Sequence, residues 1–243
     1  MNYRMVIQYD GSRYKGWQRQ KGKDKKDTIQ GRIEQVLTKQ CGREIEIQGA
    51  GRTDAGVHAK GQVASFFTDQ TLTLEEVNYY LPEDIRILSL REAGPRFHAR
   101  LNARGKVYEY RLLKKGHYNV FLRRYAWQMK EDLDLDLMRE ASQIFLGSHD
   151  FAGYCTRASK KKSTVRRVED IQVIESEGEI LLRFRGNGFL YNMVRILTGT
   201  LVDVASGKMS LDQAREALEE GERSLAGDTA PAQGLTLVEV LYD

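Results

Sequence analysis

The sequence predicts an α+β protein built from two ferredoxin-like halves, each with the element order βαββαβ and an antiparallel sheet. Short runs of β-branched and aromatic residues alternate with segments whose apolar residues recur at helical spacing. This order can be followed through residues 1–104 and again through residues 105–243. A chain of 243 residues, 41% hydrophobic and 30% charged, is long enough for one large domain or two small ones.

The first half begins with a strand at residues 3–9, which runs into a turn at Asp10-Gly11. An amphipathic helix is expected from Thr28. Its apolar residues follow the i, i+4, i+7, i+8 rule: Ile29, Ile33, Val36 and Leu37. The spacing of Asp27 and Gln30 predicts a capping box at the start of this helix, and Gly42 suits its end.

Two further strands are expected on either side of a glycine-rich segment. Ile45 and Ile47 alternate with glutamates, and residues 62–68 are rich in strand-forming types. Residues 49–61 would then be the loop that connects the two strands. Glycine-rich loops on a rigid scaffold often carry function, so this loop is the first place to look for a site.

The remaining elements follow from the same signals. Thr73 and Glu76 have capping-box spacing ahead of a short helix that Pro82 ends, and residues 85–90 read as a strand. In the second half, strands are expected at residues 106–113, 125–130, 165–174, 179–185 and 235–242, and helices at 134–145, 193–204 and from 211.

The net charge of +4 and the pI near 8.9 do not by themselves indicate a nucleic-acid-binding domain. The basic residues, however, are clustered. The clusters are Lys21, Lys23, Lys25 and Lys26; Lys114 and Lys115 with Arg123 and Arg124; and Lys160 to Arg167. Such runs are typical of solvated faces, and several basic loops together can also form a track for phosphates. Both interpretations stay open at this point.

Two cysteines without CxxC spacing, Cys41 and Cys155, indicate neither a disulfide framework nor a zinc knuckle. The four histidines are too widely spaced for a HExxH motif or paired metal ligands, so no metal site is expected. The N-terminal residues lack the apolar stretch of a signal peptide, and no window has the length of a transmembrane helix. We therefore expect a cytoplasmic protein without a membrane segment.

The string GAGRTDAGVHA, residues 49–59, holds the densest group of special residues. One interpretation is a turn in which Asp54 caps the backbone. The other is a site in which Asp54 acts together with Arg52, Thr53 or His58. The glycines do not form GxGxxG and no Gly-Lys-Ser/Thr follows, so no nucleotide cofactor is expected. A hydrolase using Asp54 and His58 would lack a recognisable nucleophile string.

This loop resembles the signature of the TruA family of tRNA pseudouridine synthases. Further blocks similar to the family occur in the expected order: YDGSRYKGWQRQ, TIQGRIEQVL, NYYLPEDI, FHAR, KVYEYRL, FLGSHDF, GNGFLYNMVRILTGTL and APAQGLTLVEV. The resemblance spans nearly the whole chain. It implies isomerisation of uridine to pseudouridine at positions 38, 39 and 40 of the tRNA anticodon stem-loop, in a central active-site cleft, by a homodimer and without a cofactor.

The resemblance also assigns site residues. Asp54 is the catalytic residue, taken as nucleophile, and Arg195 is its ion-pair partner. Attack of Asp54 on C1′, its addition to C6 and its removal of a ribose proton all stay open at this point. Without the resemblance, Arg195 reads as a snorkelling arginine on an apolar helix. Tyr108 matches the tyrosine that stacks on the target base, whereas Tyr110 on the same strand face reads as core. Arg52 is expected to reach into the stem as the uridine is extruded, or to make a loop-fixing ion pair.

Two rival functions remain at this stage. The first is a non-catalytic RNA-binding module made of paired RRM-like units, which share the βαββαβ order, although RRM-type sequence strings are absent. The second is the hydrolase already described. Chemical detection of pseudouridine in treated tRNA discriminates all three functions.

Overall fold

The computed structural model describes residues 1–19, 27–156 and 163–242, and it is a mixed α+β protein. The chain divides into two compact units. The first contains residues 1–104 together with 236–243, and the second contains residues 105–235. The last strand of the chain is therefore counted with the first unit, whereas the sequence prediction placed residues 105–243 together in the second half.

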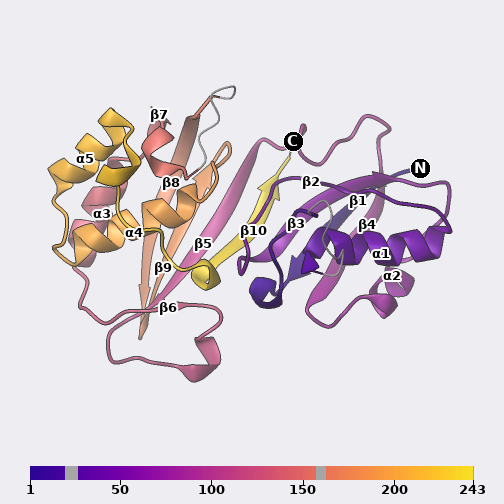
Figure 1. The fold of residues 1–243 in the computed structure, drawn as a ribbon, viewed down its shortest axis with the longest axis horizontal. Coiled ribbons are helices and arrows are strands. Elements are labelled where there is room, and N and C mark those ends of the chain that lie inside the picture. The colour runs from indigo at the N-terminus through magenta and orange to yellow at the C-terminus, as the bar shows by residue number, and fades with distance from the viewer. Residues whose placement is uncertain (20–26, 157–162, 243) are drawn as a thin grey trace. The chain divides into compact units, whose positions relative to one another are not determined.

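The first unit is a sheet with two helices. Its elements in chain order are β1 (Asn2–Tyr9), α1 (Ile29–Cys41), β2 (Gln48–Gly49), β3 (His58–Phe67), α2 (Leu74–Tyr80), β4 (Ile85–Ala93) and β10 (Leu235–Leu241). β1 lies between β4 and β3 and is antiparallel to both, and β2 is antiparallel to β3. β10 pairs with β3 in parallel, with Thr236 opposite His58. Figure 1 shows α1 and α2 side by side over this sheet.

The core of this unit comes from alternate residues of β1 and one face of α1. Met5 and Ile7 are fully buried on β1, and Ile29, Ile33 and Leu37 are fully buried on α1. This is the pattern expected when a strand of period two packs against a helix of period 3.6. The helical spacing therefore predicted Ile29, Ile33 and Leu37 on the buried face of α1 correctly, whereas Val36, expected on the same face, is only half-buried.

The second unit contains a four-stranded antiparallel sheet in the order β5-β9-β8-β7, and β6 pairs with β5 in parallel. Its elements are β5 (Gly105–Leu113), β6 (Trp127–Gln128), α3 (Leu135–Gln143), β7 (Gly147–Asp150), β8 (Val165–Ser176), β9 (Glu179–Gly186), α4 (Met193–Ala205) and α5 (Leu211–Glu220). All but two residues of α4 are buried, as its nearly all-apolar sequence predicted. β7 was not predicted, and β6 is much shorter than the strand expected at residues 125–130.

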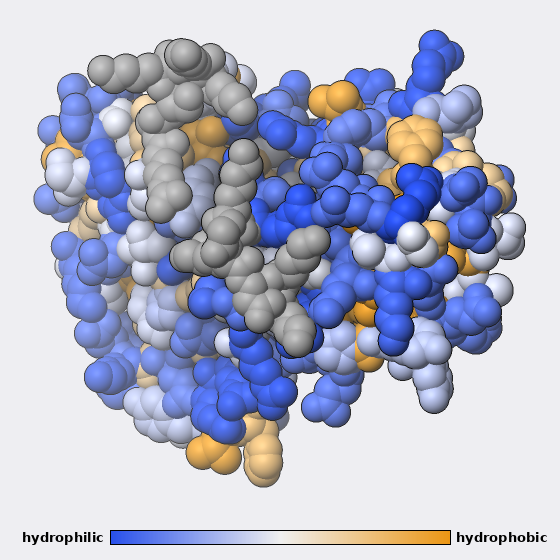
Figure 2. Space-filling view, turned by 45° about the vertical axis from the view of Figure 1, so that its right-hand side comes forward, coloured by the Kyte–Doolittle hydropathy of each residue, from blue (hydrophilic) through white to orange (hydrophobic). Residues whose placement is uncertain are grey.

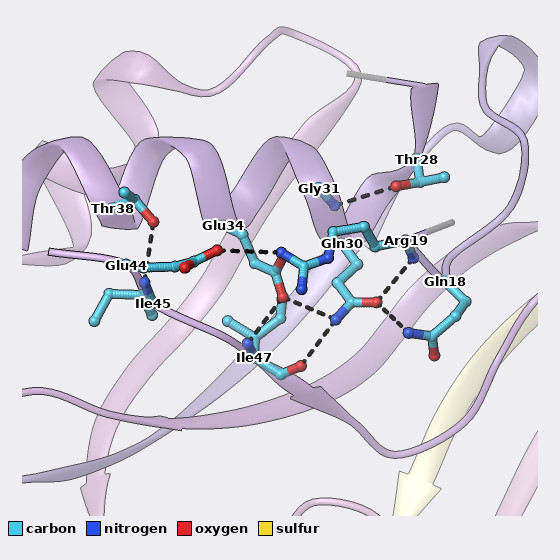
Figure 3. Close-up of polar contacts among 10 residues, drawn as sticks. All are labelled: Gln18, Arg19, Thr28, Gln30, Gly31, Glu34, Thr38, Glu44, Ile45 and Ile47. Atoms are coloured by element: carbon cyan, nitrogen blue, oxygen red, sulfur yellow. Dashed lines mark hydrogen bonds and ion pairs between the residues drawn. The ribbon is translucent and has the colours of Figure 1, made fainter. Parts of the chain in front are cut away.

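The sequence prediction was wrong about Ile45–Ile47, which do not form a strand. The backbone groups of these residues bond to side chains of α1 instead of to a neighbouring strand (Figure 3). The Ile47 N–H donates to Glu34 Oε1 at 3.1 Å, the Ile47 carbonyl accepts from Gln30 Nε2 at 3.1 Å, and the Ile45 N–H donates to Thr38 Oγ1 at 3.0 Å. Alternating hydrophobicity does not reveal where backbone hydrogen bonds go.

Two other details differ from the prediction. The N-cap of α1 is Thr28, whose hydroxyl accepts from the Gly31 N–H, and not Asp27, which instead pairs with Lys15. The glycine-rich loop is shorter than expected because β3 begins at His58. The capping box of α2, formed by Thr73 and Glu76, is confirmed.

The surface is mostly hydrophilic on the face in Figure 2, with small hydrophobic patches between charged side chains. Within the ranges that the structure describes, no helix is long and apolar enough to cross a membrane.

Glu34 is the centre of a buried polar network. It is 1% exposed, its Oε1 accepts from Gln30 Nε2 at 2.8 Å, and its Oε2 lies 3.2 Å from Arg19 Nη1. Burial raises the pKa of the Glu34 carboxyl above its usual value, and the hydrogen bonds from Ile47 and Gln30 and the charge of Arg19 only partly oppose this. The folded protein therefore holds a proton on Glu34 at a pH where the unfolded chain has lost it.

This raised pKa predicts a pH dependence of stability. Relative to Glu34→Gln, the wild-type free energy of unfolding should fall as pH rises from the ordinary glutamate pKa to the raised one, and should then level off. Denaturant unfolding of both proteins at a series of pH values from about 4 upward measures this difference. A difference that does not change with pH, or that grows as pH rises, would contradict the proposed cost of burying the charge.

Candidate functional site

Asp54 lies in the connection between β2 and β3 and is half-buried. The Val57 N–H donates to the Asp54 carbonyl at 3.1 Å, which closes a tight turn directly after this residue. Arg52 lies two residues earlier on the same connection and is exposed. The first unit therefore brings these two predicted site residues together on one loop.

Hydrogen bonds hold the residues that precede Asp54 on the loop. The hydroxyls of Tyr9 and Thr53 lie 2.7 Å apart in a buried hydrogen bond, and the Trp17 N–H donates to the Thr53 carbonyl at 3.0 Å. Gln62 Nε2 also donates to the Gly51 carbonyl at 3.0 Å. Burial raises the pKa of the Tyr9 hydroxyl far above its usual value, so this group keeps its proton well into the alkaline range.

The loop also touches the segment after β1 too closely for side chains. A Cβ added at Gly11 would lie 2.0 Å from the Val57 carbonyl oxygen, and one at Gly16 would lie 2.6 Å from the Thr53 carbonyl oxygen. Gly16 has φ +88°, a conformation that glycine adopts without strain. These two glycines of the YDGSRYKGW string thus let the backbone support the Asp54 loop directly.

His58, at the start of β3, contacts the same segment after β1 that supports the Asp54 loop. Its Nδ1 accepts from the Gly11 N–H at 3.1 Å and lies 3.1 Å from Asp10 Oδ1, and the ring is buried. The contacts of Nδ1 therefore join the end of the loop to the turn that follows β1. His58 therefore supports the backbone of the Asp54 loop.

Arg195 lies in the first turn of α4 in the second unit and is partly buried. Its Nε donates to the Ala230 carbonyl at 2.7 Å, and its Nη1 donates to Asn192 Oδ1 at 2.9 Å. The Ala230 N–H in turn donates to the Arg195 carbonyl at 3.1 Å. These bonds fix the direction of the guanidinium, which a snorkelling arginine would not require.

Asn192, the N-cap of α4, is the only non-glycine residue with positive φ in the described ranges, at +62°. Its side chain does not cap the helix. Instead its amide donates to Thr156 Oγ1 at 2.9 Å, while its carbonyl oxygen accepts from Arg195. Asn192 therefore helps to position the guanidinium of Arg195.

Tyr108, on β5, is 7% exposed, and its ring packs edge-on against Phe189 with centroids 5.4 Å apart. Tyr110, two residues along, is fully buried, and its hydroxyl donates to the Pro231 carbonyl at 2.7 Å. Burial raises the pKa of Tyr110, and the positive charge of Arg195 opposes that rise. Both rings are therefore buried, so exposure does not distinguish Tyr108 from Tyr110.

Some predicted features lie outside the described residues. These are the basic residues Lys21 to Lys26 and Lys160 to Lys162. In the parts of the chain that are described, no group of three or more histidine, cysteine, aspartate or glutamate side chains could hold a metal ion.

Sequence reasoning missed Tyr9 and Asn192 as parts of the site. Tyr9 reads as an ordinary inward-facing strand residue, and only the fold shows that its hydroxyl meets Thr53. Asn192 carried a weak signal, because asparagine tolerates the left-handed conformation better than other non-glycine residues. Only the backbone angles of the structure show that Asn192 adopts this conformation.

Comparison with known proteins identifies relatives over the whole chain. The family model described as tRNA pseudouridine synthase matches residues 5–100 and 141–243. A protein named tRNA pseudouridine synthase A 2 from Bacillus anthracis is 44% identical over 245 residues, which cover 99% of each chain. Proteins named tRNA pseudouridine synthase A from Bacillus sp. (strain KSM-64) and Acetivibrio thermocellus are 45% and 39% identical, with the same coverage.

A solved structure titled "Crystal Structure of a Cbf5-Nop10-Gar1 Complex" is also similar, with a TM-score of 0.36 and 16% identity. The match covers 96% of this chain and 57% of that chain.

The bond between Tyr9 and Thr53 gives a prediction for stability. Tyr9→Phe keeps the ring next to Trp17 but leaves the buried Thr53 hydroxyl without this partner, so the free energy of unfolding should fall by about 1 to 2 kcal/mol. Urea denaturation measures the loss. Tyr79→Phe is the matched control, because Tyr79 is 82% exposed and should change stability by less than about 0.5 kcal/mol. Equal stabilities for the two variants would show that the buried bond does not hold the loop.

Proposed function

Because the chain belongs to the family of tRNA pseudouridine synthases, we propose that it isomerises uridine to pseudouridine at positions 38, 39 and 40 of the tRNA anticodon stem-loop. The observation that carries this proposal is the Asp54 loop. Its backbone is held by the buried hydrogen bond between Tyr9 and Thr53, by the Trp17 N–H, and by the close approach of Gly11 and Gly16. A catalytic group must be held in place to act on a bound nucleotide, and this loop meets that requirement.

The chemistry suits a carboxylate and requires no cofactor. The N1–C1′ glycosidic bond must break, the uracil must turn within the site, and C5 must then bond to C1′. C5 loses its proton in this step and N1 gains one, so the product is an isomer. No atoms or electrons are gained or lost overall. A group that attacks or deprotonates the sugar or the base is needed, and we assign that role to Asp54 as nucleophile. No metal ion or nucleotide cofactor is part of the proposal.

Arg195 is proposed as the ion-pair partner that keeps Asp54 charged when substrate closes the site. A carboxylate removed from water tends to take up a proton, and a nearby guanidinium opposes this. The bonds of Arg195 to Asn192 and Ala230 support this role, because they fix the guanidinium's direction before substrate binds.

Tyr108 and Arg52 are proposed to bind the substrate. The ring of Tyr108 would stack on the target base, and its edge-on contact with Phe189 would keep it in place. The exposed side chain of Arg52 would enter the stem or bind phosphate once the uridine is extruded.

We propose further that the two halves are ferredoxin-like and enclose a central cleft. The order β4-β1-β3 with β2 antiparallel to β3 supports this for the first half. We also propose that the enzyme is a cytoplasmic homodimer that binds tRNA, as the family resemblance implies.

The direct test of the function is to treat tRNA that carries uridine at positions 38 to 40 with pure protein and to detect pseudouridine chemically. Asp54→Asn should abolish product while tRNA affinity stays within about twofold, because the amide keeps the shape and removes the charge. Lys60→Gln, an exposed site on β3, is the control and should retain activity. Substantial turnover by Asp54→Asn would overturn the assignment of the nucleophile, and no product with wild-type protein would overturn the function.

The role of Arg195 gives a separate prediction. If Arg195 keeps Asp54 ionised, Arg195→Ala should lower turnover, change tRNA affinity little and move the acidic limb of the rate profile to higher pH, because the carboxylate takes up a proton more easily. Arg195→Lys keeps the positive charge and should move the limb back toward wild type. Single-turnover rates across pH, with affinities at several salt concentrations, give both readouts.

The alternative role of Arg195 makes a different prediction. A phosphate contact would reduce the slope of log affinity against log salt by roughly 0.7 to 0.9 when it is lost. A reduced slope with unchanged turnover in Arg195→Ala would therefore refute the ion pair.

A further inference from the structure

The connection between β5 and β6 exposes large hydrophobic side chains. This connection, residues 114–126, forms the extended loop at the bottom of Figure 1. Four of its residues are exposed by 38% or more: Tyr118, Val120, Phe121 and Tyr125. Phe121 is the most exposed of them, at 81%. Clustered exposed apolar side chains next to polar ones are typical of binding surfaces.

The loop is held in a defined shape by its own hydrogen bonds. Asn119 Oδ1 accepts from the Phe121 N–H at 2.9 Å and caps a short 3₁₀ helix, Val120–Leu122. Arg123 Nη1 donates to the Val120 carbonyl at 2.7 Å, and Gln128 Nε2 donates to the Asn119 carbonyl at 3.2 Å. Phe121 is therefore presented outward by an ordered segment, which lowers the entropy lost when a partner binds.

The charge of the loop is entirely positive. Residues 114–126 contain Lys114, Lys115, Arg123 and Arg124 and no aspartate or glutamate. Lys114 is paired with Glu175, and Lys115 is paired with Asp132 at 2.7 Å. The bond from Arg123 goes to a neutral carbonyl, so it does not neutralise the guanidinium. The outer part of the loop thus combines exposed aromatic rings with arginine charge.

This combination favours RNA over a second copy of the chain as the partner. Unpaired bases stack on aromatic side chains, and arginines bind the adjoining phosphates. Two copies that met through this same patch would bring arginines toward arginines, which opposes association. The loop was one of the basic clusters in the sequence, and the proposed mechanism does not use it.

We propose that this loop is a second RNA-binding site, at which Phe121 stacks on an unpaired base of the tRNA away from the reacting uridine while Arg123 binds an adjoining phosphate. This inference rests on the proposed function for its choice of RNA. Because it concerns binding and not chemistry, loss of the loop contacts should weaken affinity and leave the rate at saturating tRNA unchanged.

The test compares Phe121→Ala and Arg123→Gln in the full-length protein. Phe121→Ala should weaken tRNA binding by about fivefold or more and leave its salt dependence unchanged. On a fully paired RNA duplex, which offers no unpaired base, the same substitution should change affinity by less than about twofold. Arg123→Gln should reduce the salt slope by roughly 0.7 to 0.9 for both RNAs.

Two variants serve as matched controls. Phe67→Ala removes another exposed phenylalanine, 60% exposed, and Lys208→Gln removes a cation that is paired with Glu131. Both should bind tRNA as wild type does. If Phe121→Ala weakens tRNA binding no more than Phe67→Ala, the proposal is overturned.

Two further readouts separate this proposal from its alternatives. If Phe121→Ala lowers the sedimenting mass of the free protein, the patch joins copies of the chain and the RNA proposal is overturned. If wild-type protein makes no pseudouridine, the proposed function fails, yet the affinities of the variants for tRNA and duplex still decide whether this loop binds RNA.

Discussion

The close approach of two backbone segments, residues 9–17 and 53–57, is the constraint on which the Asp54 loop depends. At Gly11 and Gly16 a side chain would collide with carbonyl groups of the opposite segment. The hydrogen bonds of Tyr9 and Trp17 to Thr53 can form only because the segments are so close. A carboxylate on a surface loop would otherwise sample many positions, whereas this contact fixes the backbone that carries Asp54.

Helix α1 extends this support although it lies outside the loop. The Gln30 N–H donates to the Trp17 carbonyl, and Gln30 Oε1 accepts from the Arg19 N–H, so the helix holds the segment that in turn holds Thr53. Glu34, on the same face of the helix as Gln30, holds Ile47, as Figure 3 shows. The buried carboxylate costs stability, and in return the Ile47 N–H, which has no strand partner, is satisfied.

The sequence was sufficient for elements whose signal is local. The apolar spacing of Ile29, Ile33 and Leu37 predicted α1, and the apolar run of residues 193–204 predicted α4. It was insufficient where distant groups decide the structure. Ile45–Ile47 have the alternation of a strand, but their backbone bonds go to α1.

For the candidate site, too, the sequence revealed some residues, and only the fold revealed the contacts that hold them. The Asp54 loop could be recognised because a contiguous string carries it, and family resemblance added Arg195 and Tyr108. The supports of these residues could not be recognised. Thr53 meets Tyr9 across 44 positions of sequence, and Arg195 meets Ala230 across 35. Such contacts depend on the fold, which local propensity does not determine.

The parallel pairing of β10 with β3 has a consequence for how the protein is made. Thr236 and Leu237 lie opposite His58 and Ala59, directly after the Asp54 loop, yet about 130 residues of the second unit are synthesised between residue 104 and this strand. At ordinary translation speeds that interval lasts roughly 7 to 26 s. During this time the strand leaving the Asp54 loop lacks its parallel neighbour, so the nascent first unit completes its sheet only after the second unit has been synthesised.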